Sequence, residues 1–264
     1  MTDTATLNTD LPHSARVWGY LLGGKDNFAA DRVAAEALLK ACPALVTASR
    51  EARQFLSRAV RHLAEVGVRQ FVDIGAGLPM AVTVHGVAQA VAPQARIVYV
   101  DNDPLVMVHA RALLTGTGQG SVDYVEADVR DPGAVLAALH TTAVDLSAPA
   151  GLLLSAILPE LPDGQAHDVV GKLVAALAPG SYVVLSHYTA DPVTEPVRAM
   201  IADAAEAHQL PLRLRTRAEV ARFLEGLELV DPGVVSTAHW RVAAKDRTAD
   251  ESAAMCWAAV GRLP

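Results

Sequence analysis

The chain has 264 residues, of which 52% are hydrophobic and 19% are charged, and its formal net charge is −7. This length suits one large α/β domain with additions, or two small domains. A nucleic-acid partner would require a basic stripe, and the densest basic cluster, residues 213–222, is interrupted by Glu219. We therefore expect no nucleic-acid partner.

Cysteine usage and the N-terminus favour a reducing, cytoplasmic compartment. Cys42 and Cys256 are the two cysteines, 214 residues apart, and they form no metal-ligand spacing, so no metal site is expected. The polar, acidic start MTDTATLNTD does not resemble a signal peptide. The best apolar run, residues 151–158, is too short to span a bilayer, so no membrane partner is expected.

The first part of the chain predicts a helical extension. Residues 1–12 are expected to form a disordered tail, and residues 13–27 an irregular, glycine-rich segment. Asn27 is a candidate cap for a helix over residues 28–41, and a one-sided apolar stripe predicts a second helix over residues 47–66. Residues 13–67 thus form an extension, or lid, before the main unit, residues 68–264.

The next part alternates apolar runs with helical patterns. Strands are predicted over residues 69–75, 96–101, 121–128, 150–158 and 181–188. Helices are predicted over residues 79–91, 104–114, 132–139 and 165–177. Strands that are apolar throughout and alternate with helices predict a parallel sheet covered on both faces.

The C-terminal part completes this sheet. Helices are predicted over residues 192–208 and 216–224, followed by strands over residues 227–235 and 255–262. A polar loop, residues 236–252, joins these two strands without a helix. We therefore expect about seven strands, mostly parallel, with one of the last two running antiparallel at the sheet edge.

The first predicted strand runs into a glycine turn, VDIGAGLP. Asp73 lies at the strand end, and Gly75 and Gly77 form the turn into a helix whose first turn holds Pro79. Glycine allows the backbone to approach a ligand closely and to adopt positive φ. In a doubly wound sheet, such a turn opens into the crevice where ligands bind. Taken alone, the turn is weak evidence for a ligand.

Two further strand ends carry acids. Asp101 follows Gly75 by 26 residues and is placed to accept the hydroxyls of a ribose. Asp128 follows Asp101 by 27 residues, and with the Val129 N–H it could contact an adenine. Asn102 and Ser155, at the ends of the second and fourth strands, join the expected cofactor-binding set. The alternative is that these acids are helix N-caps.

Three strand ends with a glycine turn and two acids predict a site for an adenine nucleoside. Asp73 and the acidic balance disfavour a pyrophosphate, and Met80 occupies the third glycine position of a dinucleotide-binding turn. S-adenosylmethionine carries no phosphate, and its sulfonium and ammonium groups tolerate nearby carboxylates. S-adenosylmethionine is therefore the expected cofactor, and a NAD-dependent oxidoreductase is the disfavoured alternative.

VDIGAGLP, VYVDNDP and EADVRDP resemble motifs of class I S-adenosylmethionine-dependent methyltransferases. With ARVWGYLLGGKDNFAADR, the chain resembles from residue 15 to 264 a bacterial methyltransferase-like family long described as a domain of unknown function. The resemblance implies a Rossmann-like class I methyltransferase sheet, bound S-adenosylmethionine and methyl transfer. It does not indicate a particular acceptor. Pro79 replaces the third glycine of the usual methyltransferase turn, which would change the start of the following helix. Trp18-Gly19 replaces the Tyr-Asp that is usual in the family, which would reshape the acceptor pocket.

The segment GYLLGGKD, residues 19–26, nearly matches a phosphate-binding loop. Asp26 stands where such a loop has Ser or Thr, and no buried strand precedes the segment, so we expect no nucleoside triphosphate there. The resemblance instead suggests a lid over the cofactor that includes Tyr20, Gly24, Lys25 and Asp26. Lys25 would meet the methionine carboxylate, or Asp26 the ammonium; the alternative is a simple turn with a solvated Lys25.

Candidate catalytic residues lie where the fourth and fifth strands end. His187 is the preferred general base because its pKa can lie near neutral pH, although a histidine bonded to backbone at a strand end is an equal alternative. Tyr188 and Glu160 complete the catalytic set. The leading hypothesis is a methyltransferase for a small molecule; a noncatalytic S-adenosylmethionine-binding or regulatory protein is the alternative, and a homodimer is left open.

Overall fold

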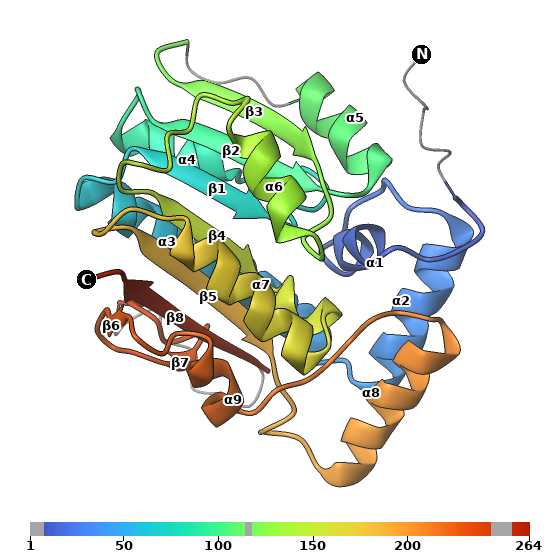
Figure 1. Cartoon of the computed structure of the whole chain (residues 1–264). Coiled ribbons are helices and arrows are strands. Elements are labelled where there is room, and N and C mark those ends of the chain that lie inside the picture. Colours follow the sequence, from blue (N-terminus) through green and yellow to red (C-terminus); the bar gives the residue numbers. More distant parts are fainter. Residues whose placement is uncertain (1–7, 114–117, 244–254) are drawn as a thin grey trace.

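The computed structural model describes residues 8–113, 118–243 and 255–264 (Figure 1). In this part of the chain one sheet has the strand order β3-β2-β1-β4-β5-β8-β6, and β7 also pairs with β8. The strands are β1 (Gln70–Ile74), β2 (Arg96–Asp101), β3 (Ser121–Glu126), β4 (Gly151–Ser155), β5 (Tyr182–Tyr188), β6 (Glu228–Leu229), β7 (Val235–Ser236) and β8 (Cys256–Arg262).

Helices precede, separate and follow the strands. They are α1 (Ser14–Leu21), α2 (Ala29–Ala41), α3 (Leu45–Glu65), α4 (Val84–Val91), α5 (Pro104–Leu113), α6 (Pro132–Leu139), α7 (Asp163–Ala175), α8 (Glu195–Ala207), α9 (Arg217–Arg222) and a 3₁₀ turn, η1 (Leu158–Glu160). None of the described helices is long and apolar enough to cross a membrane.

Strands β1 to β5 are all parallel, and the chain order reverses between β1 and β4. This reversal creates a crevice at the carboxyl ends of the strands. β8 runs antiparallel to β5, as predicted for one of the last two strands. It does not lie at the edge, however, because β6 and β7 pair with its outer side. The predicted strand over residues 227–235 is thus two short strands.

The strands are apolar on both faces because helices cover both faces (Figure 1). One face packs against α3 and α4, through side chains that include Phe55 and Phe71. The other face packs against α6, α7 and α9, through side chains that include Leu154 and Leu185. Two covered faces explain why the strand sequences lack a polar alternation.

A separate small core lies beyond the carboxyl ends of the parallel strands. It joins α1, α2, the first half of α3 and α8 (Figure 1). α1 corrects the expectation of an irregular segment over residues 13–27: His13 caps the helix by accepting from the N–H of Ala15 at 3.3 Å. The part of the expected disordered tail before residue 8 lies outside the described residues.

Two helix starts differ from the prediction. Asn27 does not cap α2; Asp31 in its first turn accepts from the N–H of Phe28 at 2.8 Å, and Asn27 donates to the carbonyl of Gly24. Helix α4 begins at Val84 instead of residue 79, because Thr83 is its cap and Pro79 lies in the preceding loop. The loop after the glycine turn is therefore longer than predicted.

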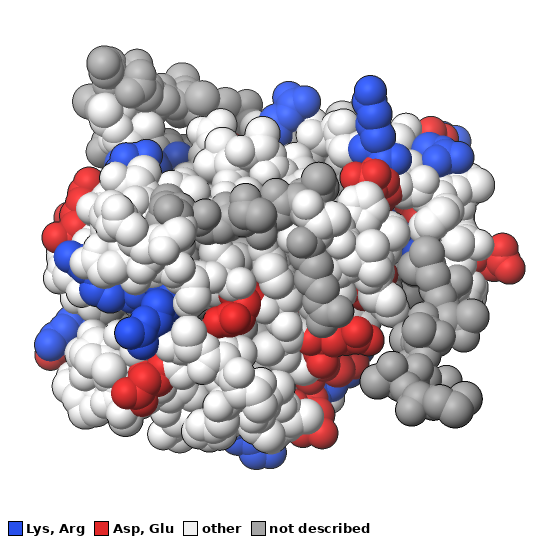
Figure 2. Space-filling model, turned by 90° about the horizontal axis from the view of Figure 1, so that it is seen from above, with Lys and Arg blue, Asp and Glu red and all other residues white. Residues whose placement is uncertain are grey.

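The face shown in Figure 2 carries acidic and basic side chains scattered over a mostly uncharged surface.

Candidate cofactor and acceptor site

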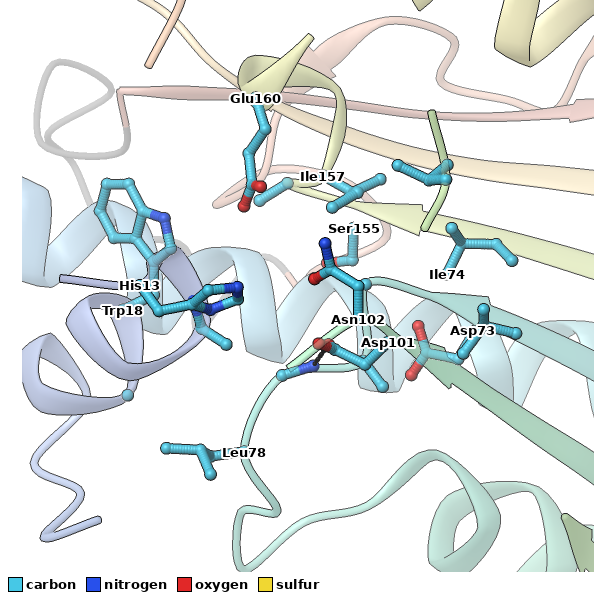
Figure 3. A pocket seen from close by; sticks show the side chains of 18 of the residues that line it. His13, Trp18, Asp73, Ile74, Leu78, Asp101, Asn102, Ser155, Ile157 and Glu160 are labelled. Atoms are coloured by element: carbon cyan, nitrogen blue, oxygen red, sulfur yellow. Dashed lines mark hydrogen bonds between the residues drawn. The ribbon is translucent and has the colours of Figure 1, made fainter. Parts of the chain in front are cut away.

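A cavity lies at the carboxyl ends of β1 to β5, roofed by α1 and α3. Its empty volume is about 1030 Å³, open solvent at its mouth included. Of the residues predicted from sequence, ten line it: Asp73, Gly75, Gly77, Asp101, Asn102, Asp128, Val129, Ser155, Glu160 and Tyr188. Figure 3 shows acidic side chains converging on this space from several strand ends.

The glycine turn after β1 forms the floor of the cavity. Gly75 and Gly77 have φ of +71° and +67°, which side chains with a Cβ rarely adopt. A Cβ on Gly75 would lie 2.6 Å from the Cδ1 atom of Ile157, whereas a Cβ on Gly77 would meet nothing within 4 Å. The turn thus needs glycine twice, and Gly77 leaves open space.

The end of β2 is tied to this turn through Asp101. Its carboxylate accepts from the N–H of Gly77 at 2.8 Å and from the N–H of Asp103 at 2.9 Å (Figure 3). Burial raises the pKa of Asp101, and these two hydrogen bonds oppose the rise. Each carboxylate oxygen keeps a second lone pair, so Asp101 can still accept from the hydroxyls of a ribose.

The end of β3 carries Asp128, a more exposed acid. Its oxygens accept from the N–H of Arg130 at 2.8 Å, from the Arg130 guanidinium at 2.9 Å and from the amide of Asn102 at 3.3 Å. Asn102 and Asp128 therefore join the second and third strand ends. Val129 beside them is buried and lines the same cavity.

Asp73 is the most deeply placed acid of the cavity. Its residue is 2% exposed, and no hydrogen bond to its carboxylate is found within the described residues. Burial raises the pKa of Asp73 to about 7, the positive charge of Arg53 opposes this rise, and Asp101 adds to it. A cationic group in the cavity would stabilise the ionised form of Asp73.

The N-terminal segment reaches the cavity through α1 and not through the glycine loop. His13, Ala15, Trp18, Gly19 and Leu22 line the cavity. The predicted lid residues Tyr20, Gly24, Lys25 and Asp26 are not among the lining residues. The Tyr20 hydroxyl donates to the Glu36 carboxylate on α2, and the Gly24 N–H donates to the Gly19 carbonyl at 2.8 Å. The Asp26 carboxylate lies 3.6 Å from the His109 Nδ1 atom.

Tyr188 and Trp18 form an aromatic wall. Their rings stack with centroids 4.6 Å apart, and the Tyr188 hydroxyl lies 3.0 Å from the Ser49 hydroxyl on α3. Burial raises the pKa of Tyr188 above its usual range, so the phenol stays protonated at neutral pH. Ser49 itself donates to the carbonyl of Leu45, so the Tyr188 hydroxyl donates to Ser49. A protonated phenol is a poor proton acceptor, so Tyr188 shapes the cavity wall.

Glu160 points into the cavity from the 3₁₀ turn after β4 (Figure 3). Burial raises the pKa of Glu160 to about 7; the nearby charge of Asp101 adds to the rise, and a hydrogen bond with Ser14 opposes it. A carboxyl group with this pKa is partly ionised at neutral pH, so it can take up or release a proton there.

His187 corrects the preferred prediction for the general base. It is fully buried and does not line the cavity. Its Nδ1 lies 2.7 Å from the Tyr188 carbonyl and its Nε2 lies 2.7 Å from Arg215, so Nδ1 donates and Nε2 accepts. Burial lowers the pKa of His187 to about 3, and the charge of Arg215 adds to the lowering. The backbone-bonded alternative describes it.

Arg215 holds the turn that carries Glu160. It is buried and donates to the carbonyls of Leu158 and Leu161 at 2.9 and 2.7 Å, on either side of Glu160. Its backbone N–H also reaches the carbonyl of Tyr188. His187, as a neutral acceptor, orients this arginine.

Sequence reasoning missed the residues that α3 and the chain before it contribute. Ser49, Ala52 and Arg53 line the cavity from α3. Arg53 lies beside Ala52 and Leu56, which face the interior, so it is a charge on the apolar face of a helix. A charged residue on the apolar face of a predicted helix was the one sequence signal that could have indicated Arg53 as a site residue.

Comparisons with known proteins agree with this geometry. A sequence model of the family described as S-adenosyl methyltransferase matches residues 1–264. Among curated protein sequences, none matches the chain.

Two solved structures resemble the chain over nearly its whole length. A DUF574 family protein from Streptomyces avermitilis is 40% identical, with a TM-score of 0.92 over 98% of this chain and 100% of that one. A putative methyltransferase from Thermobifida fusca is 39% identical, with a TM-score of 0.87 over 97% of both chains.

A more distant likeness shows the fold alone. Human N-acetylserotonin methyltransferase, solved in complex with S-adenosylmethionine, is 16% identical, with a TM-score of 0.51 over 94% of this chain and 66% of that one. The full-length family match and the two similar structures indicate the same cofactor as the glycine turn and the acids at the strand ends. The chain belongs to the S-adenosyl methyltransferase family, whose members use S-adenosylmethionine as methyl donor.

Proposed function

We propose that this methyltransferase binds its cofactor across the carboxyl ends of β1, β2 and β3 and methylates a small molecule held beneath α1. The observation that carries the proposal is the single cavity into which Gly77, Asp101 and Asp128 open together with Glu160 and Tyr188. When bound, S-adenosylmethionine supplies a methyl group on a positively charged sulfur.

The protein side chains divide the work of binding. Asp101 accepts from the ribose hydroxyls, and Asp128 with the Val129 N–H meets the adenine. The turn leaves room for the methionine part at Gly77, where a Cβ would enter open space, while Gly75 allows the close contact with Ile157. Asp73 offers negative charge to the ammonium group. Positioning of this kind supplies much of the rate of an in-line transfer.

Glu160 is our proposed general base, in place of His187. It lies on the cavity wall, its pKa is about 7, and Arg215 fixes the turn that carries it. Its carboxylate takes the proton that leaves a hydroxyl or amine of the acceptor. Trp18 and Tyr188 provide an apolar aromatic wall for the acceptor skeleton and exclude water.

The walls favour a small acceptor over a nucleic acid. α1 and α3 roof the cavity, and the chain carries a net charge of −7, which would repel a polyanion. Both cysteines are buried and unpaired, which supports a reducing cytoplasm.

Calorimetry with S-adenosylmethionine and S-adenosylhomocysteine tests the cofactor site. Asp101→Asn should weaken the binding of both by about tenfold or more, since charged acceptors lose about 1.5–3 kcal/mol per hydrogen bond. Unchanged affinity would show that the ribose does not lie on Asp101.

Turnover tests the acceptor side. Formation of S-adenosylhomocysteine is measured against a panel of small phenols, alcohols and amines between pH 6 and 8.5. With an active acceptor, Glu160→Gln should lower kcat about 100-fold, within the range for general base catalysis, and leave cofactor affinity within threefold. Glu206→Gln, on the exposed side of α8, is the matched control. Full activity of Glu160→Gln would remove Glu160 as the base.

A further inference from the structure

Arg53 is a cation on the cavity wall, and the proposed function assigns no role to it. It lies on α3 and lines both the main cavity and a smaller one that adjoins it behind the glycine turn. The smaller cavity is walled by residues of the β1–α4 loop and by Asp73. Arg53 therefore lies beside both Asp73 and the glycine turn.

The guanidinium of Arg53 has few partners within the described residues. Its Nη2 donates to the carbonyl of Val82 at 3.3 Å, a long hydrogen bond. No carboxylate of the described chain lies within ion-pair distance of it. A guanidinium carries five N–H donors, so most of them remain for a ligand.

The electrostatics place Arg53 close to the end of β1. Burial raises the pKa of Asp73, and the charge of Arg53 is the largest effect that opposes this rise. Its charge also counteracts the effect of burial on the pKa of Tyr188, at the end of β5. Arg53 and Asp73 thus present opposite charges at one place without forming a direct ion pair.

We infer that Arg53 binds the carboxylate of the amino-acid end of S-adenosylmethionine; this inference rests on the proposed function. The amino-acid end is a zwitterion, and Asp73 and Arg53 offer one complementary charge to each of its two groups. A planar guanidinium matches a carboxylate with two parallel hydrogen bonds. Arg53 takes the role that the sequence suggested for Lys25, which does not line the cavity.

The test compares two cofactors that differ in this carboxylate alone. Calorimetry measures the Kd of S-adenosylmethionine and of decarboxylated S-adenosylmethionine, which keeps the sulfonium and the ammonium. The unaltered enzyme should prefer S-adenosylmethionine by roughly 10- to 100-fold, the range for a hydrogen bond to a charged group. Arg53→Met should lose this preference, by weakening S-adenosylmethionine and leaving the decarboxylated cofactor within threefold.

Arg50→Met is the matched control, because Arg50 is exposed on the same helix. It should leave both affinities unchanged. Arg53→Lys keeps the charge without the fork and should give an intermediate preference, which also serves if the methionine variant does not fold.

Three results would overturn the inference: equal affinities in the unaltered enzyme, a preference that survives in Arg53→Met, or a parallel loss for both cofactors. Failure of the proposed function looks different, because then the unaltered enzyme binds neither cofactor.

Discussion

Replacing Asp73 by asparagine tests whether the ionised Asp73 carboxylate, which we propose binds the cofactor, destabilises the cofactor-free fold. Burial raises the pKa of Asp73 from 3.8 to about 7. Because the pKa of Asp73 is higher in the folded than in the unfolded state, its contribution to the free energy of unfolding is fully present below pH 3.8. This contribution is lost as pH rises through about 7. Asparagine is neutral throughout, so the variant avoids this loss.

The size of the effect follows from the same pKa. At about 1.4 kcal/mol per pKa unit, the full difference is on the order of 4 kcal/mol, of which roughly 2–3 kcal/mol falls between pH 5 and pH 8. At about 2–4 °C per kcal/mol for a chain of this size, the Tm advantage of Asp73→Asn should grow by roughly 5–10 °C over that range.

Thermal unfolding of the cofactor-free protein at pH 5 and pH 8 measures this. Asp203→Asn, an exposed acid on α8, is the control and should show the same Tm difference at both values. The stabilised Asp73→Asn should bind S-adenosylmethionine more weakly, since the ammonium loses its negative partner. A Tm advantage of Asp73→Asn that does not change with pH would refute the reasoning.

Two further predictions concern backbone and turn geometry. Gly75→Ala should destabilise the fold by about 1–3 kcal/mol and weaken cofactor binding, because φ is +71° and the added Cβ would meet Ile157. Gly164→Ala is the control and should not destabilise the fold, because open space surrounds Gly164. Arg215→Met should lower the free energy of unfolding by about 2–4 kcal/mol, measured by urea titration, because buried carbonyls and His187 lose their donor. Asp163→Ala removes a largely exposed partner of Arg215 and should lower it by under about 1 kcal/mol. Equal losses for either pair would contradict the argument.

The sheet and its strand ends could be predicted because the evidence for them is local. Buried parallel strands are largely apolar runs, and an acid lies at or near the ends of β1 and β2, at Asp73 and Asp101. The spacing of these strand ends predicted an adenine nucleoside site, and the family followed from the resemblance of the motifs at these ends and in residues 15–32. The short helix α1 was missed because Gly19 and a buried Arg16 interrupt its apolar pattern, and Arg16 is held by Asp31, a partner far along the chain.

The acceptor side was predicted less well, since it depends on which way a strand end faces. Neighbouring strand residues point to opposite faces, so Tyr188 and His187 could not both reach the cavity. Tyr188 packs with Trp18 beneath α1, whereas His187 packs against Phe223 near α9 on the other face. Arg53 could be assigned only after α3 was placed against the glycine turn, which requires tertiary packing.

The position of α3 has a consequence for how the chain can be divided. Its second half covers one face of the sheet through Phe55, Leu56 and Leu63, while its first half brings Arg53 to the cavity. A fragment that starts at residue 68 would therefore expose a large apolar surface and aggregate. Grafting a homologue's N-terminal segment onto this enzyme should exchange residues up to 44, before α3 begins, so that acceptor preference changes while the sheet stays covered.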